Sequence, residues 1–125
     1  MGASQRTKGQ VGERELCAIL SRDLGLDLTR NLDQVREGGA DILGVPGFII
    51  ECKRCQVLNK AMWWKQVVKA GLQYPHLIPV VAYRMNRQPW RYMLPLWLIV
   101  VDAEQKEFLE VDHGGFIKLF ATRQS

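Results

Sequence analysis

The order of helical and extended segments in this chain predicts an α/β domain with a central mixed β-sheet flanked by helices. Three observations carry the prediction. Leucines recur at helical spacing through residues 9–25, two extended segments joined by a glycine-rich turn follow, and a second helical segment precedes further hydrophobic strands. At 125 residues the chain is long enough to bury one core. We therefore expect a single domain, residues 1–125, in which residues 1–7 are flexible.

The best-defined pair of strands is expected at residues 41–53. Residues 44–47, Gly-Val-Pro-Gly, supply a turn, because glycine tolerates positive φ and proline fixes its own φ. The next six residues are rich in β-branched and aromatic side chains, which favours a strand. Because side chains alternate across a strand, Glu51 and Lys53 share one face, and Cys52 points into the core on the other face.

Three charged side chains of this hairpin indicate metal-dependent phosphodiester hydrolysis. Asp41 and Glu51 lie on neighbouring strands and can converge on one divalent ion, and Mg²⁺ prefers carboxylate, water and phosphate oxygens. We expect the backbone carbonyl of Cys52 as a further ligand. Lys53 would lie beside the ion, where its ammonium can orient the attacking water and offset transition-state charge. The alternative is a surface salt bridge between Glu51 and Lys53, because a Glu-x-Lys pattern alone is short.

The first helix contributes a further acid. At about 100° per residue, the leucines of the repeat fall within about 60° of Glu13, so Glu13 lies in the middle of the buried stripe. Glu15 then points to solvent. A carboxylate in an apolar stripe needs a cation, and a metal shared with the hairpin acids would supply one. The alternative is a partly exposed first-turn glutamate that the helix dipole favours.

The remaining segments predict a second helix and two further strands. The second helix turns its aromatic residues toward the core and carries Gln66 at the edge of that face. A surface role is the favoured interpretation for Gln66, and a contact with the site is the alternative. The expected elements are a loop or short strand at 27–34, a helix at 58–72, a strand at 78–85, a turn at 86–89, an antiparallel strand at 90–94, a segment at 95–110 that could be strand or helix, and a last short segment at 116–120.

Charge and cysteine content narrow the class of protein. The net charge of +4 and a sequence pI of about 9.2 favour a polyanionic partner. Basic residues near the carboxylates suit a nuclease, in which cations hold phosphates while acids hold the metal. Three cysteines fit a reducing compartment, and no apolar run reaches membrane-spanning length, so we expect a cytoplasmic protein without a membrane partner. The Cys52-x-x-Cys55 pair lacks the further ligands of a zinc site.

Several segments form a recognisable combination. They are Lys-Gly-x-x-Gly-Glu-Arg-Glu-Leu at 8–16, Val-Arg at 35–36, Asp-Ile-Leu at 41–43, Ile-Glu-Cys-Lys at 50–53, Ile-Pro-Val-Val-Ala at 78–82 and Trp-Arg-Tyr at 90–92. Together they resemble the archaeal-type Holliday junction resolvases, which belong to the PD-(D/E)xK nuclease superfamily. The resemblance implies a restriction-endonuclease-like core, and so compact a chain would suit a phage genome.

The resemblance also implies a role for each matching residue. Glu13, Asp41 and Glu51 would be metal-binding carboxylates, and Lys53 would be the catalytic lysine. Two arginines match positions that contact the junction backbone in the family, and three further basic residues lie within the motifs or next to them. The resulting DNA-binding candidates are Lys8, Arg14, Arg36, Arg54 and Arg91.

The function that the resemblance implies is a Mg²⁺-dependent endonuclease that resolves four-way DNA junctions by paired symmetric nicks, as a homodimer. Mn²⁺ is expected to substitute for Mg²⁺. A second hypothesis keeps the chemistry but changes the substrate to forks, flaps or duplex DNA. A third is a non-catalytic DNA-binding module, against which the presence of all four site residues argues. A purely structural protein would leave a glutamate in an apolar stripe unexplained.

Overall fold

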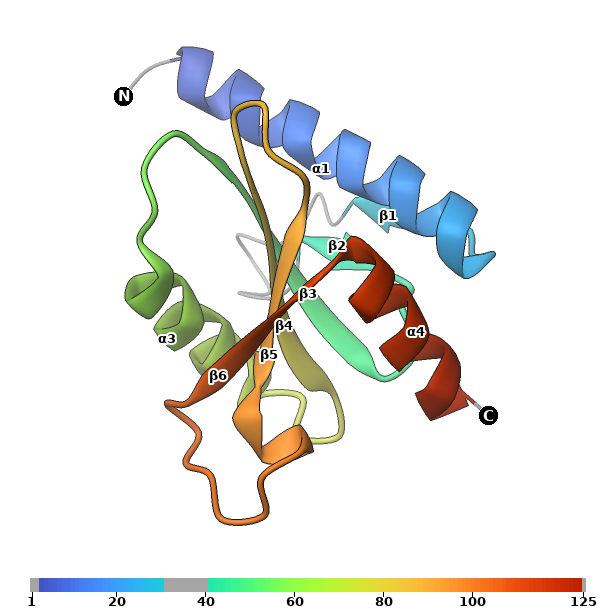
Figure 1. Cartoon of the computed structure of the whole chain (residues 1–125). Coiled ribbons are helices and arrows are strands. Elements are labelled where there is room, and N and C mark those ends of the chain that lie inside the picture. The colour runs from blue at the N-terminus through green and yellow to red at the C-terminus, as the bar shows by residue number, and fades with distance from the viewer. Residues whose placement is uncertain (1–2, 31–40, 125) are drawn as a thin grey trace.

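The computed structural model describes the backbone of residues 3–30 and 41–124, and all side chains in these ranges except those of residues 3–8 and 43. This part of the chain contains three α-helices, six strands and one short 3₁₀ helix (Figure 1). The helices are α1 (Ala3–Leu24), α3 (Lys60–Gly71), α4 (His113–Gln124) and the 3₁₀ helix η1 (Leu96–Leu98). The strands are β1 (Thr29–Arg30), β2 (Ile42–Leu43), β3 (Phe48–Cys55), β4 (Ile78–Met85), β5 (Arg91–Pro95) and β6 (Phe108–Asp112).

The six strands form one mixed sheet, in the order in which they occur in the sequence. Neighbouring strands are antiparallel except β3 and β4, which run parallel. A parallel pair needs a crossover connection, and α3 provides it. In the turn between β2 and β3, Gly44 and Gly47 adopt positive φ angles of 99° and 83°. The predicted α/β fold with a central mixed sheet is confirmed, and so is the hairpin that was expected to carry the site.

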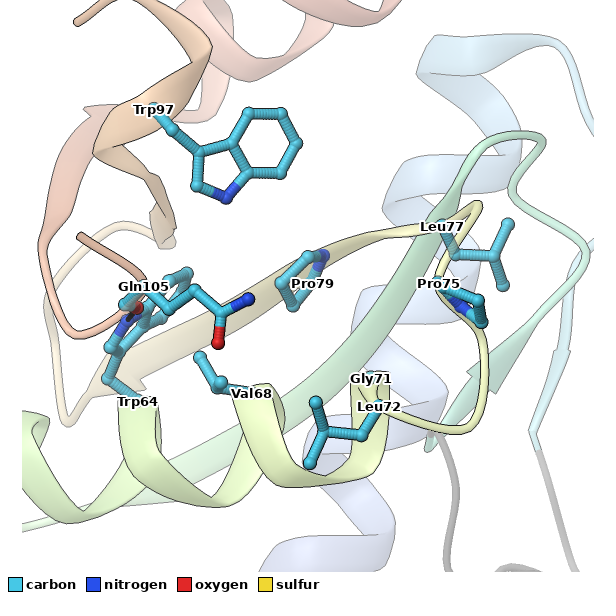
Figure 2. Close-up of a pocket in the computed structure, with 9 residues that line it drawn as sticks. All are labelled: Trp64, Val68, Gly71, Leu72, Pro75, Leu77, Pro79, Trp97 and Gln105. Atoms are coloured by element: carbon cyan, nitrogen blue, oxygen red, sulfur yellow. Dashed lines mark hydrogen bonds between the residues drawn. The ribbon is translucent and has the colours of Figure 1, made fainter. Parts of the chain in front are cut away.

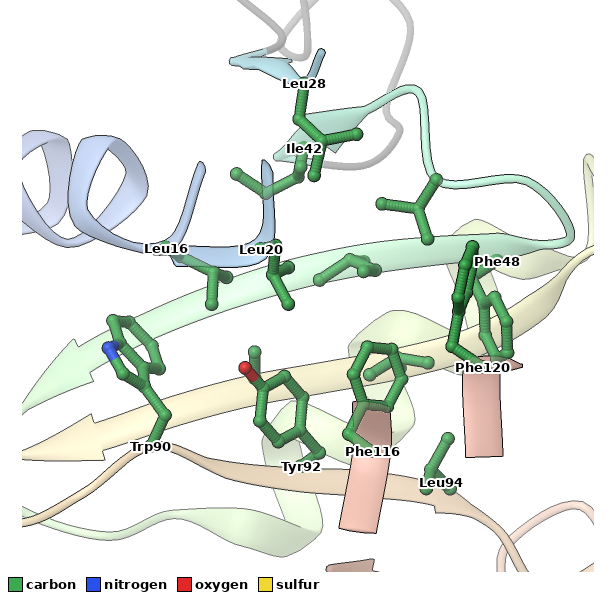
Figure 3. Close-up of a cluster of buried hydrophobic side chains, with 14 of the residues drawn as sticks. Leu16, Leu20, Leu28, Ile42, Phe48, Trp90, Tyr92, Leu94, Phe116 and Phe120 are labelled. Carbon is green, nitrogen blue, oxygen red and sulfur yellow. The ribbon is translucent and has the colours of Figure 1, made fainter. Parts of the chain in front are cut away.

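Helices cover both faces of the sheet. Along β4, Val80 and Ala82 pack in a cluster with α1 and α4, whereas Val81 and Tyr83 pack with α3. Figure 3 shows that leucines of α1 and phenylalanines of α4 both contribute to the first cluster, which packs against the strands. Burial of each large apolar side chain contributes roughly 1.5–3 kcal/mol. The central strands are thus buried on both sides, which explains why β4 is almost continuously hydrophobic.

A hydrogen-bonded chain joins α1, β5 and α4 at the edge of the first cluster. The Tyr92 hydroxyl lies 2.8 Å from His113 Nδ1, and His113 Nε2 lies 2.7 Å from Asp23 Oδ2. In neutral His113, Nε2–H donates to Asp23 while Nδ1 accepts from the Tyr92 hydroxyl. Hydrogen bonds from Arg22 and then from His113 hold the pKa of Asp23 well below its usual range. These hydrogen bonds fix α4 against the end of α1.

The ends of α1 and α3 differ from those that the sequence predicted. α1 begins at Ala3 rather than near Gly9, so it includes five of the residues that were expected to be flexible, 3–7. Gly9 has open space around it and is simply accommodated in the helix. α3 is slightly shorter than predicted, spanning Lys60–Gly71. None of the helices in the described ranges is long and apolar enough to cross a membrane.

The C-terminal region resolves the ambiguity left by the sequence. Residues 95–110 contain the end of β5, the 3₁₀ helix η1 and the start of β6. The last segment is a helix of 12 residues that begins at His113, before the two glycines that were expected to precede it. Asp112 Oδ1 accepts a hydrogen bond from the Gly115 N–H at 2.7 Å and so caps the helix. Asp112 is the sequence feature that marks the beginning of α4, whereas Gly114 and Gly115 suggested that the helix begins after them.

Candidate active site

Asp41 is fixed at the beginning of the β2–β3 hairpin. Its backbone N–H donates to the Ile50 carbonyl at 2.9 Å, which continues the pairing of the two strands. Its Oδ2 atom accepts a hydrogen bond from the Cys52 N–H at 2.7 Å. The side chain is only 7% exposed, and Asp41 is the only buried charged residue among those whose side chains are described. The hairpin therefore holds a buried carboxylate against the middle of β3.

Glu51 lies next to this carboxylate on β3 and is half-buried. Burial and then the Asp41 carboxylate raise the pKa of Glu51, the Lys53 ammonium opposes them, and the net result is a pKa of about 7. Two acids in one partly buried place disfavour each other's ionised form. A bound cation would reverse this, so the pair is suited to a hard divalent ion that takes oxygen ligands.

Lys53 follows two residues later on the same face of β3, as predicted. Its Nζ donates a hydrogen bond to Gln66 Oε1 at 3.1 Å. Gln66 lies on α3 between Trp63 and Val67, which are both buried against the sheet. Gln66 is exposed, as the favoured interpretation of the sequence predicted, and the structure also contains the contact with Lys53 that was the alternative.

Glu13 projects from α1 and is largely buried, with 16% of its side chain exposed, as its place in the apolar stripe predicted. Its cation in the structure is an arginine, because Arg30 Nε lies 3.0 Å from Glu13 Oε1. Burial raises the pKa of the Cys52 thiol, and the charges of Asp41 and Glu13 add to the effect. Glu13 and Asp41 therefore both act on Cys52.

Gly12 explains how α1 comes close to β3. A Cβ atom at this position would lie 2.7 Å from the Cβ of Arg54, a distance that side chains do not tolerate. The absence of a side chain at Gly12 thus allows the helix to approach the strand one residue before Glu13. Gly12 belongs to the motif at 8–16, but the sequence pattern gives no physical reason for a glycine there.

The prediction that Glu15 points to solvent is wrong. Its carboxylate accepts hydrogen bonds from the Arg84 guanidinium and from Trp90 Nε1, the latter at 2.9 Å, and 34% of its side chain is exposed. The β4–β5 hairpin covers the face of α1 that the helical periodicity alone assigned to solvent. Glu15 joins α1 to that hairpin, so its role is structural.

The DNA-binding candidates are spread over several elements. Arg14 is exposed on α1 and lines a groove with Arg30. Arg54 donates to Asn86 Oδ1 at 2.6 Å, and Arg91 pairs with Glu110 at 3.7 Å while 43% of its side chain is exposed. Arg36 and the side chain of Lys8 lie outside the described residues. These contacts leave the guanidinium of Arg14 the most accessible of the three described arginines.

Clusters of histidine, cysteine and carboxylate side chains are common binding sites for metal ions in proteins. No group of three or more such side chains suited to a metal ion is found within the described ranges. Cys52 packs with the α1 cluster and Cys55 with the α3 cluster, so the two thiols point to opposite faces of β3. The oxygen donors that the structure does bring together are those of Asp41 and Glu51, with the Cys52 backbone between them.

Comparisons with known proteins identify the family and the fold of this chain. A family model described as "Phage putative PDDEXK endonuclease" matches residues 4–114. No curated protein matches the sequence significantly. Among solved structures, the chain is similar to Hjc, a Holliday junction resolvase of the archaeal hyperthermophile Archaeoglobus fulgidus, with a TM-score of 0.52 and 23% identity over 86% of this chain and 85% of that one. This likeness supports the restriction-endonuclease-like core.

Proposed function

The chain belongs to the phage PDDEXK endonuclease family, and we propose that it is a Mg²⁺-dependent DNA endonuclease that cuts four-way junctions as a homodimer. In this proposal Asp41 and Glu51 bind the metal, together with the backbone carbonyl of Cys52. Lys53 is the catalytic lysine. Mn²⁺, with similar ligand preferences, is expected to substitute for Mg²⁺.

The observation that carries the proposal is the pairing of Asp41 with Glu51. Asp41 is 7% exposed, and burial together with the Asp41 charge raises the pKa of Glu51 to about 7. A buried acid beside a half-buried one destabilises the fold when both are ionised, unless a cation joins them. Mg²⁺ bound there would polarise the scissile phosphate and lower the pKa of an attacking water.

The chain's own residues then have distinct tasks. The Cys52 N–H orients the Asp41 carboxylate, and the strand geometry places the Lys53 ammonium on the same side as Glu51, where it can stabilise charge on the phosphate. Glu13 would complete the site from α1 by exchanging Arg30 for the metal or a metal-bound water. Arg30 would then be free to contact a phosphate beside Arg14, with which it lines a groove.

The substrate part of the proposal depends on the family resemblance and on the overall charge. The structural neighbour from Archaeoglobus fulgidus is a Holliday junction resolvase, and the net charge of +4 favours a polyanion. Paired nicks in opposing strands require two sites, which a homodimer supplies. The DNA contacts would come from Lys8, Arg14, Arg36, Arg54 and Arg91.

The test compares a synthetic four-way junction with a linear duplex of the same sequence, each with Mg²⁺ and with EDTA. Wild type and Glu51→Gln are assayed beside Asp27→Asn, a change at an exposed carboxylate between α1 and β1 that serves as the matched control. Symmetric nicks in the junction alone, lost with EDTA and in Glu51→Gln but kept in the control, are the expected result. Equal cutting of both DNAs would retain the nuclease and reject the junction. Binding without cutting would leave only a DNA-binding module.

A further inference from the structure

An apolar groove lies between α3, the start of β4 and the segment after β5. It encloses about 170 Å³ and is lined mainly by apolar side chains, among them Val68, Leu72, Pro79 and Trp97. Figure 2 shows Trp97 on one side of the groove and Leu72, the residue after α3, on the other, with Pro79 between them. The groove thus joins two elements that are far apart in the sequence.

Three further exposed apolar residues, Ile99, Val100 and Val101, follow Trp97 closely in the sequence. The N–H groups of Ile99 and Val100 both bond to the Leu96 carbonyl, at 3.1 and 3.0 Å, so the chain turns sharply and keeps the following residues at the surface. Val101 is fully exposed. We call the set the groove surface, and it consists of Leu72, Trp97, Ile99, Val100 and Val101. A gathering of this kind indicates an interaction site, whereas single exposed apolar residues do not.

The charges on the two sides of the groove surface are opposite. On the α3 side, Lys65 and Lys69 are exposed, and residues 56–77 contain no acid. On the other side, the exposed segment 102–107 carries Asp102, Glu104 and Glu107 against one lysine. In a two-fold symmetric interface each side meets the opposite side of the partner, so a surface that is basic on one side and acidic on the other complements itself.

We propose that the groove surface is the contact between two copies of this chain, related by a two-fold axis. The inference rests on the proposed homodimer and assigns its location. A stable interface buries about 800 Å² per partner, with an apolar centre and a polar rim. The five exposed apolar residues supply the centre, and the lysines of α3 opposite the acids of 102–107 supply the rim.

The test measures the oligomeric state of the full chain by sedimentation equilibrium. Wild type is expected to be a dimer, and Ile99→Asp or Val101→Asp should weaken dimerisation at least about tenfold because a charge is buried at the apolar centre. Val57→Asp is the matched control, because Val57 is 77% exposed in the loop that precedes α3. Lys69→Glu should also weaken the dimer, and adding Glu104→Lys should restore it.

Two results would overturn this location. A wild type that stays monomeric at about 100 μM, or an unchanged dimer in Ile99→Asp and Val101→Asp, rejects the groove surface. Either can occur in a chain that cuts DNA with Mg²⁺, so failure of the interface is separable from failure of the nuclease. Conversely, a dimer that these variants dissociate would support the interface even if no DNA is cut.

A different observation assigns a role to Gln66. Lys53 Nζ donates to Gln66 Oε1, and within residues 9–30 and 41–124 no carboxylate forms an ion pair with Lys53. An amide oxygen can orient an ammonium group without neutralising its charge, whereas a carboxylate would reduce the charge available to a phosphate. The buried neighbours Trp63 and Val67 hold the helix that carries Gln66.

We infer that Gln66 is a positioning residue for Lys53. Gln66→Ala should lower the single-turnover cleavage rate about tenfold with little change in DNA affinity, because only the orientation of the ammonium is lost. The double variant Lys53→Met/Gln66→Ala should cut no more slowly than Lys53→Met, since Gln66 acts through the lysine. Gln73→Ala, at an exposed glutamine just after α3, is the matched control. Additive losses in the double variant would contradict the inference.

A second measurement does not depend on cleavage. Nitrogen relaxation of the Lys53 ammonium should show an order parameter that falls from a restrained value toward about 0.6 or less in Gln66→Ala. An unchanged order parameter would show that the amide does not hold the lysine, whatever the DNA assay gives. If the order parameter falls while wild type cuts no DNA, the positioning contact stands and the proposed nuclease activity fails.

Discussion

Glu51 and Glu110 stand at the two ends of one row of residues across the sheet. The row runs through in-register neighbours on four strands, from Glu51 to Val81, Met93 and Glu110. Paired residues of adjacent strands project to the same side of a sheet, so both glutamates are on the face that α3 covers. The same residue type on the same face is therefore placed in two different surroundings.

The surroundings differ in the sign of the neighbouring charges. Glu110 accepts hydrogen bonds from the Tyr83 hydroxyl at 2.5 Å and from Lys60 Nζ at 2.6 Å. Although burial opposes the effect, these hydrogen bonds lower the pKa of Glu110. At Glu51, burial and then the neighbouring Asp41 carboxylate raise the pKa to about 7, although the Lys53 ammonium opposes them. A glutamate with its own cation stabilises the fold, whereas a glutamate beside another acid is available to an external cation.

The largest expected effect is that one glutamate variant loses DNA cleavage while the other loses stability. Glu51→Gln should lower Mg²⁺-dependent DNA cleavage about 10²–10³-fold, because a metal ligand is lost. Glu110→Gln should leave cleavage within about threefold and instead lower the free energy of unfolding by about 1–3 kcal/mol, because Lys60 and Tyr83 lose a charged acceptor. Single-turnover kinetics and urea unfolding measure the two. A loss of cleavage in Glu110→Gln as deep as in Glu51→Gln would abolish the distinction.

The pH dependence of stability gives the next effect. Glu51 titrates near 4.5 in the unfolded chain and at about 7 in the folded one, so the folded state binds the extra proton between these values. The contribution of Glu51 to the free energy of unfolding is therefore fully present below pH 4.5 and is lost as the pH rises through 7. At pH 8, Glu51→Gln should be more stable than wild type by up to about 3 kcal/mol. Urea unfolding at pH 8 and 4.5 measures this, and an equal difference at both values would contradict it.

Metal binding should remove the same penalty. In Mg²⁺ at ten to a hundred times its dissociation constant, wild type at pH 8 should gain about 1–3 kcal/mol of stability over EDTA at matched ionic strength. Glu51→Gln and Asp41→Asn should gain little, while Glu110→Gln should gain as much as wild type. Thermal unfolding measures the gain without any DNA. A gain shared equally by all four proteins would mean that Mg²⁺ acts elsewhere.

Local sequence patterns predicted the strand and the face on which Glu51 lies, but they did not predict the surroundings of Glu110. The turn at 44–47 and the alternation along β3 are properties of adjacent residues, so the shared face of Glu51 and Lys53 was accessible from sequence. The partners of Glu110 come from α3, β4 and β5, at distances along the chain of 27 and 50 residues for Tyr83 and Lys60. No local pattern records such contacts.

The same limit explains the errors on α1. Helical periodicity correctly placed Glu13 among buried leucines, but it could not show that Arg30 would be its partner. It assigned Glu15 to solvent because the helix was considered alone, and the β4–β5 hairpin, 69 residues away at Arg84, covers that face. Periodicity predicts which face of a helix meets the core, and not what packs on the opposite face.

The smallest expected effect tests whether α1 contributes to the difference between the two glutamates. Gly12→Ala places a Cβ atom 2.7 Å from the Arg54 Cβ, so helix and strand must move apart, at a cost of about 1–3 kcal/mol. Gly9→Ala is the matched control, because it has open space and should stabilise the helix by about 0.5–1 kcal/mol. Urea unfolding of both variants measures this. If Gly12→Ala is as stable as Gly9→Ala, α1 does not need its close approach to β3. If Gly12→Ala is destabilised and also cuts DNA more slowly, then cleavage depends on the position of Glu13 in addition to the Asp41–Glu51 pair.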